Sequence, residues 1–172
     1  MMMKNVLLGA ALLAASLAGG AAKPADYSGA WTLDTKQSKN LPPFYANVKS
    51  HKLLVRQDWG HLSVAVEVED GGAEPFRTSF DYSLDGKETK TETLMRTPSG
   101  TRAVPTTLKA VAAEDGGLRI TITREAVRRD QPFRMVTTED WRLSPDGRTL
   151  YIRRADDTPR GKAESEMVFV KG

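Results

Sequence analysis

The chain has 172 residues, of which 40% are hydrophobic and 27% charged, with 25 basic against 22 acidic side chains and no cysteine. This length fits one domain, and the lack of cysteine excludes a disulfide scaffold, a thiolate metal site and a cysteine nucleophile. The near balance of charge argues against nucleic acid as a partner. Apolar residues are concentrated in the first 22 positions, so the rest of the chain is poor in them for its size.

Residues 1–22 have the order of a secretory signal peptide: a positive start at Lys4, an apolar run over 6–17 and small residues after it. The run is shorter than the roughly 20 apolar residues that a membrane-spanning helix needs. We expect cleavage before Lys23, with positions 21 and 22 as alternatives, and one mature domain over residues 23–172. The pattern predicts a periplasmic or secreted protein with no stable membrane insertion after cleavage, and a retained anchor is the other interpretation.

Most of the mature chain alternates between apolar and polar residues with a period of two, which is typical of strands with one buried face. Turns rich in Gly, Asp and Pro separate these runs, and no segment keeps helical spacing over three turns. The expected strands cover residues 27–33, 51–58, 62–69, 76–84, 88–95, 102–112, 118–122, 133–143, 150–152 and 164–171. Because open edges invite aggregation, we predict an all-β fold, an antiparallel up-and-down barrel of about 8–10 strands rather than a sandwich.

The turn at residues 85–86, Asp-Gly, predicts a tight hairpin between the strands on either side of it. A two-residue turn there places Phe80 opposite Thr91 on one face. On the other face it places Asp81 opposite Lys90, an opposite-charge pair that favours the same register.

A second hairpin is predicted around residues 144–147, Ser-Pro-Asp-Gly. Its expected register places Thr137 opposite Arg154. Glu139 then lies diagonal to Arg154 on the apolar face, within reach of a long side chain.

The faces that these registers turn inward mix aromatic rings with hydroxyls and one pair of opposite charges. A dry core would not tolerate so many unpaired polar groups, which favours a hydrated lumen that binds a small amphipathic or apolar ligand. The other interpretation is that the threonines lie near strand ends or face solvent and that the charges form a structural ion pair, since threonine is a good strand former. The candidate ligand-binding residues are Phe80, Tyr82, Thr91, Thr137, Glu139, Trp141 and Arg154.

The mature chain opens with a G-x-W triplet at residues 29–31, and a W-R-L-S-P-D-G-R-T-L run covers residues 141–150. A glycine lets a strand bend as it enters a barrel, and a large indole can close the floor. In this order the motifs resemble bacterial secreted lipocalin-like proteins of unassigned function, within the calycin group. The resemblance implies an antiparallel barrel with a pocket and structural roles for Gly29 and Trp31. It implies no particular ligand and no cofactor.

The chain departs from typical lipocalins because it has no T-D-Y element, no cysteine and no apparent helix after the barrel. In that family an arginine on the final barrel strand stacks on the signature Trp. Arg153 and Arg154, on the penultimate strand, are the two candidates for this role against Trp31. Arg154 is the better one, because it shares a face with Leu150 and Ile152.

Catalytic and metal-binding motifs are missing from the sequence. The two histidines, His51 and His61, are expected about 23 Å apart along one hairpin, at about 3.3 Å per residue, too far to share a metal. We therefore predict no metal and no catalytic constellation. The one acid/base candidate is Glu139, whose pKa burial would raise unless Arg154 keeps it ionised.

Three functional interpretations follow. The first is a lumen that binds a small molecule. The second is a surface that docks an anionic extracytoplasmic partner through Arg128, Arg129 and Arg153, within a locally basic stretch over 118–162. The third is an enzyme that uses Glu139.

Overall fold

The structure is a computed structural model that describes residues 24–172 except 73, 98–99 and 129. The predicted signal peptide, residues 1–22, lies outside the described residues. In the described part the chain forms ten antiparallel strands and a short 3-10 helix, η1 (Pro43–Asn47). The strands are β1 (Gly29–Leu33), β2 (Ser50–Gln57), β3 (His61–Glu69), β4 (Phe76–Ser83), β5 (Thr89–Thr97), β6 (Gly100–Ala112), β7 (Leu118–Arg128), β8 (Gln131–Leu143), β9 (Thr149–Thr158) and β10 (Gly161–Lys171).

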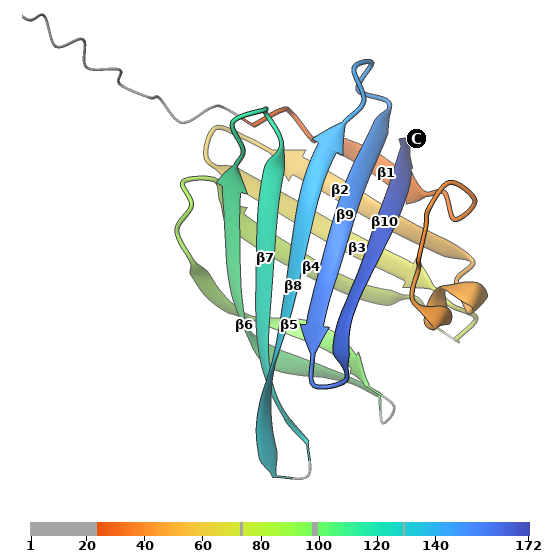
Figure 1. The fold of residues 1–172 in the computed structure, drawn as a ribbon, viewed down its shortest axis with the longest axis vertical. Helices are drawn as coiled ribbons and strands as arrows, with labels where there is room; N and C mark the ends of the chain where they lie inside the picture. The colour runs from red at the N-terminus through yellow and green to blue at the C-terminus, as the bar shows by residue number, and fades with distance from the viewer. Residues whose placement is uncertain (1–23, 73, 98–99, 129) are drawn as a thin grey trace, which may run out of the picture.

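One sheet holds all ten strands, in the order β4-β3-β2-β1-β10-β9-β8-β7-β6-β5. Consecutive strands pair with each other, except that β4 and β5 are the two edges and β1 pairs with β10. The sheet curls until these edges approach, which produces a nearly closed barrel (Figure 1). The prediction of an all-β up-and-down barrel is therefore confirmed.

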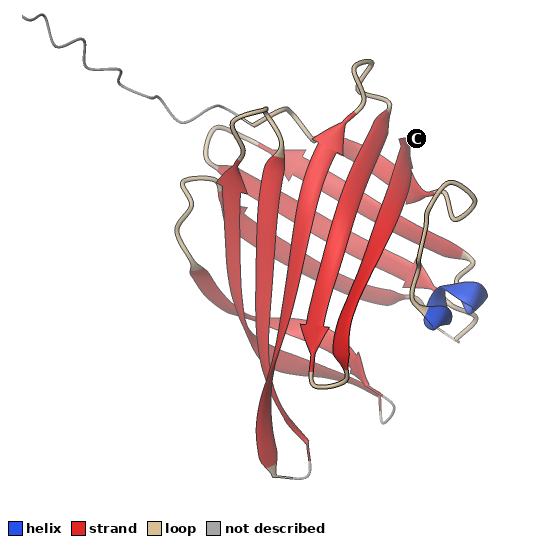
Figure 2. Ribbon diagram, in the orientation of Figure 1, coloured by secondary structure: helices blue, strands red, loops and turns tan. Residues whose placement is uncertain are grey.

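The barrel interior follows from the period of two in the sequence. On β2, the side chains of His51, Leu53 and Val55 are buried and alternate with exposed neighbours. The same alternation on the other strands builds one continuous core inside the barrel. Figure 2 shows η1 beside the end of the barrel where β2 begins. Among the described residues, no helix has the length and apolar character to cross a membrane.

The tryptophan of the G-x-W triplet is buried in the core of the barrel. Trp31 is 1% exposed, and its indole Nε1 donates a hydrogen bond of 2.9 Å to the Tyr27 carbonyl. The cation over its ring is Lys171, with Nζ 5.1 Å from the ring centroid. The expectation that Arg154 stacks on Trp31 is therefore wrong. Trp31 pairs directly with Lys171 across the β1–β10 ladder, which places that ammonium at the indole.

The predicted hairpin at residues 85–86 is wrong. β5 pairs along β6 and not with β4, so Phe80 does not face Thr91. The backbone N–H of Leu84 donates to the Gly60 carbonyl at 2.8 Å, and the Asp85 carboxylate accepts the backbone N–H of Lys87 at 3.0 Å. The loop satisfies its polar groups in this way without a β4–β5 ladder.

The second predicted hairpin exists, but its register differs by two residues. Glu139 pairs directly with Arg154, and Thr137 pairs with Asp156. The connecting loop is longer than expected, since Leu143 pairs with Leu150, and the backbone N–H of Thr149 donates to the Ser144 hydroxyl at 2.9 Å within it. A slip of two residues keeps every side chain on its face, so Glu139 and Arg154 still point inward.

Candidate functional site

A cavity of about 530 Å³ lies inside the barrel, under η1. This volume is within the range of roughly 300–1,000 Å³ that is usual for small-molecule sites. Most of the wall is apolar or aromatic, with a smaller number of charged and hydroxyl groups. Its aromatic members are Phe44, Tyr45, His51, Phe76, Phe80, Tyr82, Trp141 and Phe169.

Five of the seven predicted ligand-binding residues line this cavity: Phe80, Tyr82, Glu139, Trp141 and Arg154. Glu139, Trp141 and Arg154 come from the neighbouring strands β8 and β9, whereas Phe80 and Tyr82 come from β4, which reaches them because the sheet curls.

The two predicted threonines are placed differently. Thr137 is buried beside the cavity wall, where its hydroxyl donates to Asp156 Oδ1 at 2.6 Å. Thr91 is exposed on the free edge of β5, so its assignment to the lumen is wrong. That error follows from the hairpin at residues 85–86. The buried threonine of this strand is Thr93, which shares a hydrogen bond of 2.8 Å with Thr106.

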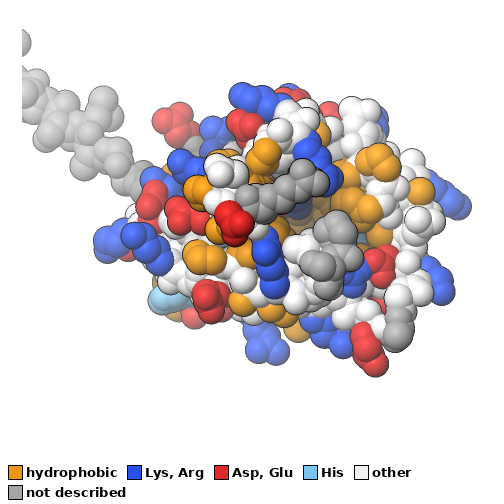
Figure 3. All heavy atoms as spheres, turned by 90° about the horizontal axis from the view of Figure 1, so that it is seen from below, with side chains coloured by type: hydrophobic (Ala, Val, Ile, Leu, Met, Phe, Trp, Pro, Cys, Tyr) orange, Lys and Arg blue, Asp and Glu red, His pale blue; other side chains and the backbone are white. Residues whose placement is uncertain are grey.

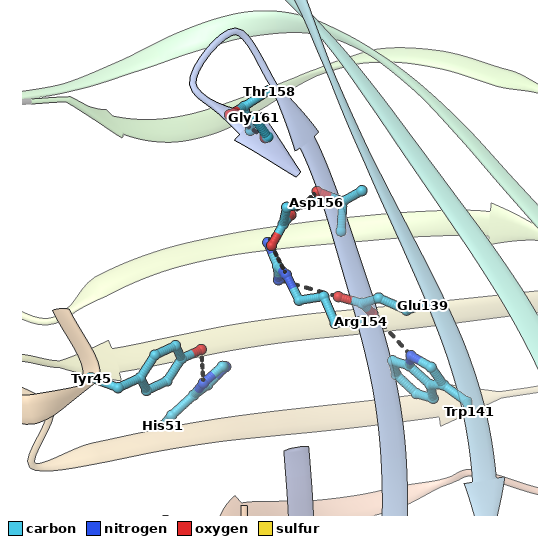
Figure 4. A network of polar contacts seen from close by, with 9 residues as sticks. Tyr45, His51, Glu139, Trp141, Arg154, Asp156, Thr158 and Gly161 are labelled. Carbon is cyan, nitrogen blue, oxygen red and sulfur yellow. Dashed lines mark hydrogen bonds and ion pairs between the residues drawn. The ribbon is translucent and has the colours of Figure 1, made fainter. Parts of the chain in front are cut away.

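Arg154 forms a closed network with two carboxylates on the cavity wall (Figure 4). Its Nε and Nη2 donate to both oxygens of Asp156, at 2.8 and 2.9 Å, and its Nη1 lies 3.3 Å from Glu139 Oε1. Burial alone would lower the pKa of Arg154, but the hydrogen bonds to Asp156 and the attraction of Glu139 raise it above the ordinary value. Arg154 therefore places one positive charge between two carboxylates, and the charge of Arg124 also lowers the pKa of Asp156.

Both oxygens of Glu139 accept hydrogen bonds. Oε1 faces Arg154, and Oε2 accepts the indole N–H of Trp141 at 2.9 Å. The third interpretation, with Glu139 as an acid/base, is not tested by this geometry, because each oxygen accepts one hydrogen bond and keeps a second lone pair.

Arg124 on β7 and Arg96 on β5 are cations of the wall that sequence reasoning missed. The guanidinium carbon of Arg124 lies 5.6 Å from the ring centroid of Phe80, and its Nε donates a long hydrogen bond of 3.4 Å to the Thr93 hydroxyl. Burial, with the nearby charge of Arg154, lowers the pKa of Arg124 from its ordinary value. Within the described residues it forms no salt bridge. The sequence did contain a signal for this residue. Leu118, Ile120 and Ile122 occupy every second position, and residue 124 is the next position on the same face.

Tyr45 and His51 join η1 to the barrel wall (Figure 4). A hydrogen bond of 3.0 Å connects the Tyr45 hydroxyl and His51 Nδ1, and their rings stack with centroids 5.8 Å apart. Burial and the charge of Arg154 lower the pKa of His51 to about 4, and burial raises the pKa of Tyr45 to about 12. Both groups are therefore neutral at pH 7. This contact holds η1 over the cavity.

The other predicted groups lie away from the cavity. His61 is exposed, 3.5 Å from Asp58, while His51 faces the lumen. In the part of the chain that the structure describes, no cluster of three or more His, Cys, Asp or Glu side chains could hold a metal ion. Arg153 is an exposed residue paired with Glu164 at 3.2 Å, and the side chains of residues 128 and 129 lie outside the described set.

Comparison with known proteins gives a likeness in fold. No protein-family model matches the chain, and no curated protein matches it. Among solved structures the chain is similar to zebrafish ileal bile acid-binding protein in complex with cholic acid, with a TM-score of 0.50 and 13% sequence identity. The likeness covers 85% of this chain and 98% of that one. The chain thus has a calycin-like fold, a nearly closed antiparallel β-barrel.

Proposed function

We propose that this protein binds a small amphipathic anion in the barrel cavity, with the anionic group on Arg124 and the apolar body against the aromatic wall. The observation that carries the proposal is the state of Arg124, a half-buried guanidinium on the cavity wall without a described carboxylate partner.

The charges on the wall single out Arg124 for this role. Arg154 already donates to Glu139 and Asp156, and Arg96 forms a salt bridge with Asp70. Arg124 feels the charges of Glu139 and Asp156 but donates to neither carboxylate in the described part of the chain. A ligand carboxylate or sulfonate would accept two of its N–H donors at once.

The apolar part of a ligand would lie along the side chains on either side of this cation. Phe80 and Ile122 lie next to Arg124, and Ile152 and Phe169 continue the surface across the barrel. Burying apolar area there contributes roughly 25 cal/mol per Å². The cholic acid in the complex of the zebrafish protein is an amphipathic carboxylate, which supports this class of ligand.

Two fluorescent probes of similar size separate the charge from the apolar contact. 1-Anilinonaphthalene-8-sulfonate (ANS) is anionic, and N-phenyl-1-naphthylamine (NPN) is neutral. We expect Arg124→Met to weaken ANS binding by about 10-fold or more, since a hydrogen bond to a charged group contributes about 1.5–3 kcal/mol, and to leave NPN binding within about twofold. Arg56→Met, on the exposed face of β2, is the matched control. Equal ANS affinity in wild type and Arg124→Met would overturn the proposal.

The location of the protein belongs to the same proposal. The pattern of residues 1–22 supports a periplasmic or secreted product. The intact mass of the protein recovered from its host tests this: a mature chain that begins near residue 23 is expected, and a chain that keeps residues 1–22 would contradict it.

A further inference from the structure

A second cleft, of about 610 Å³, lies at the mouth end of the barrel. It is bounded by the ends of β5 and β6, the β7–β8 hairpin and the β9–β10 turn, and we call it the mouth cleft. It shares the end of β5 with the cavity, from Met95 to Thr97. Figure 3, which views the molecule from below, shows hydrophobic side chains surrounded by Lys and Arg side chains at this end.

The floor of the mouth cleft continues the inward face of the barrel beyond the cavity. Along β8, the residues at every second position face the same side, so Phe133 and Met135 share the face of Glu139 and Trp141. Met135 pairs with Arg124 across the β7–β8 ladder. Apolar residues therefore line the inward face on both sides of a polar layer.

That polar layer separates the two spaces. Between Met135 in the cleft and Glu139 in the cavity, the hydroxyl of Thr137 donates to Asp156, which in turn holds Arg154. The polar atoms of this layer already hydrogen-bond to one another, so an apolar ligand chain that displaced them would break these bonds without replacing them. Along β8 the cleft and the cavity thus have separate apolar surfaces, while at the end of β5 they share the residues from Met95 to Thr97.

The cleft carries positive charge that the protein does not neutralise. Its lining contains three arginines and, within the described residues, no Asp or Glu. Arg96 is paired with Asp70, but Arg102 and Arg160 form no salt bridge in the described part of the chain. Arg102 Nη2 donates to the Val127 carbonyl at 3.1 Å, which holds this cation beside the hairpin.

We propose that the mouth cleft is a second binding site, which takes one free anionic amphiphile with its charged group at Arg102 and Arg160 and its apolar part on Met135 and Phe133. Charge complementarity selects an anion, and the apolar floor selects an amphiphile over an inorganic ion. The cleft is concave and similar in volume to the cavity, which favours a single molecule over the flat surface of a bilayer. The site does not depend on Arg124, so it can exist whether or not the cavity binds.

Dodecanoate, used below its micelle concentration, tests the proposal by native mass spectrometry and calorimetry. We expect two molecules per wild-type chain, and one in the exposed double variant Arg102→Ser/Arg160→Ser. The matched double variant Arg56→Ser/Arg148→Ser, which removes two exposed arginines away from the cleft, should keep two.

The Met methyl signals locate each molecule, because Met135 lines only the cleft and Met167 only the cavity. Arg124→Met should lose the perturbation at Met167 and keep the one at Met135. A double variant that still binds two molecules, or a Met135 signal that never moves, would overturn the second site.

Two further outcomes separate the hypotheses. If the Met135 signal alone responds to dodecanoate, the cavity proposal fails and the cleft stands. If the double variant loses flotation with phosphatidylglycerol vesicles while its dodecanoate binding is unchanged, the arginines serve a membrane surface and the small-ligand site is refuted.

Discussion

Replacing Arg154 by methionine should destabilise the barrel strongly at pH 7, because it leaves Glu139 and Asp156 as unpaired carboxylates. Removing one partner of a buried ion pair costs about 3–5 kcal/mol. The side chains are 30% exposed for Arg154, 12% for Glu139 and 21% for Asp156. Partial access to water places the expected loss at the lower end, about 3 kcal/mol, or a fall in Tm of roughly 6–12 °C for a domain of this size.

The pH dependence of this loss gives a second readout. In the wild type, burial would raise the pKa of Asp156, but Arg154 lowers it below the ordinary value. Its contribution to stability is therefore present above the unfolded pKa of about 3.9 and lost as pH falls through the lower folded pKa. In Arg154→Met the unpaired carboxylate instead takes a raised pKa, so the variant gains stability as pH falls from 7 toward about 4.5.

Urea unfolding, followed by far-UV circular dichroism and tryptophan fluorescence, measures the free energy of unfolding of both proteins at pH 7 and pH 4.5. The expected difference is about 3 kcal/mol at pH 7 and smaller at pH 4.5. Arg154→Met/Asp156→Asn should recover part of the loss, because it removes one unpaired charge. A difference below about 1 kcal/mol at pH 7, the size of a surface ion pair, would refute the reasoning.

Further predictions concern the contact between η1 and the barrel, and Gly29 at the start of β1. His51 has a folded pKa of about 4, below its ordinary value of 6.5. Its contribution to the free energy of unfolding should therefore be fully present above pH 6.5 and fall by up to about 3 kcal/mol between pH 6.5 and 4. Urea unfolding of His51→Phe should lack this dependence on pH. Tyr45→Phe removes the hydrogen bond to His51 and should cost about 1 kcal/mol in the same assay. Gly29 has a φ of 150°, a backbone conformation that residues with a side chain rarely adopt, so Gly29→Ala should cost about 1–3 kcal/mol. Gly60→Ala, with open space around it, should lower the thermal midpoint little.

The strands and their inward faces could be predicted because alternation is a local property. Trp141, Glu139 and Arg154 have the right phase in the sequence, and their side chains point into the lumen as expected. A register error of two residues at the β8–β9 hairpin did not change this, since the faces repeat with the same period. The direct pairing of Glu139 with Arg154 depends on the loop length, which turn chemistry alone did not define.

The pairing of β5 could not be predicted from the Asp-Gly turn. Such a turn favours a hairpin only if the two strands have no better partners. Here every residue of β5, from Thr89 to Thr97, pairs with β6. The exposed position of Thr91 follows from that long-range choice. The position of Tyr45 over the cavity also depends on how the β1–β2 connection packs on the barrel.

The positions of Arg124 and His51, in contrast, were within reach of sequence reasoning. His51 alternates with Leu53 and Val55, and Arg124 continues the inward row of β7 past Ile122. The expected strand ended at residue 122, the last apolar residue of its alternating row. A charged side chain in the buried phase of a strand is therefore a signal for a site rather than for the end of a strand.

The central claim is that the guanidinium of Arg124 recognises the charge of a ligand inside the barrel. The most direct measurement is the ratio of ANS to NPN affinity, taken for wild type and for Arg124→Met under the same conditions. We expect this ratio to fall by about 10-fold or more in Arg124→Met, through ANS alone. An unchanged ratio would contradict the claim, because it would show that Arg124 does not recognise the negative charge of ANS.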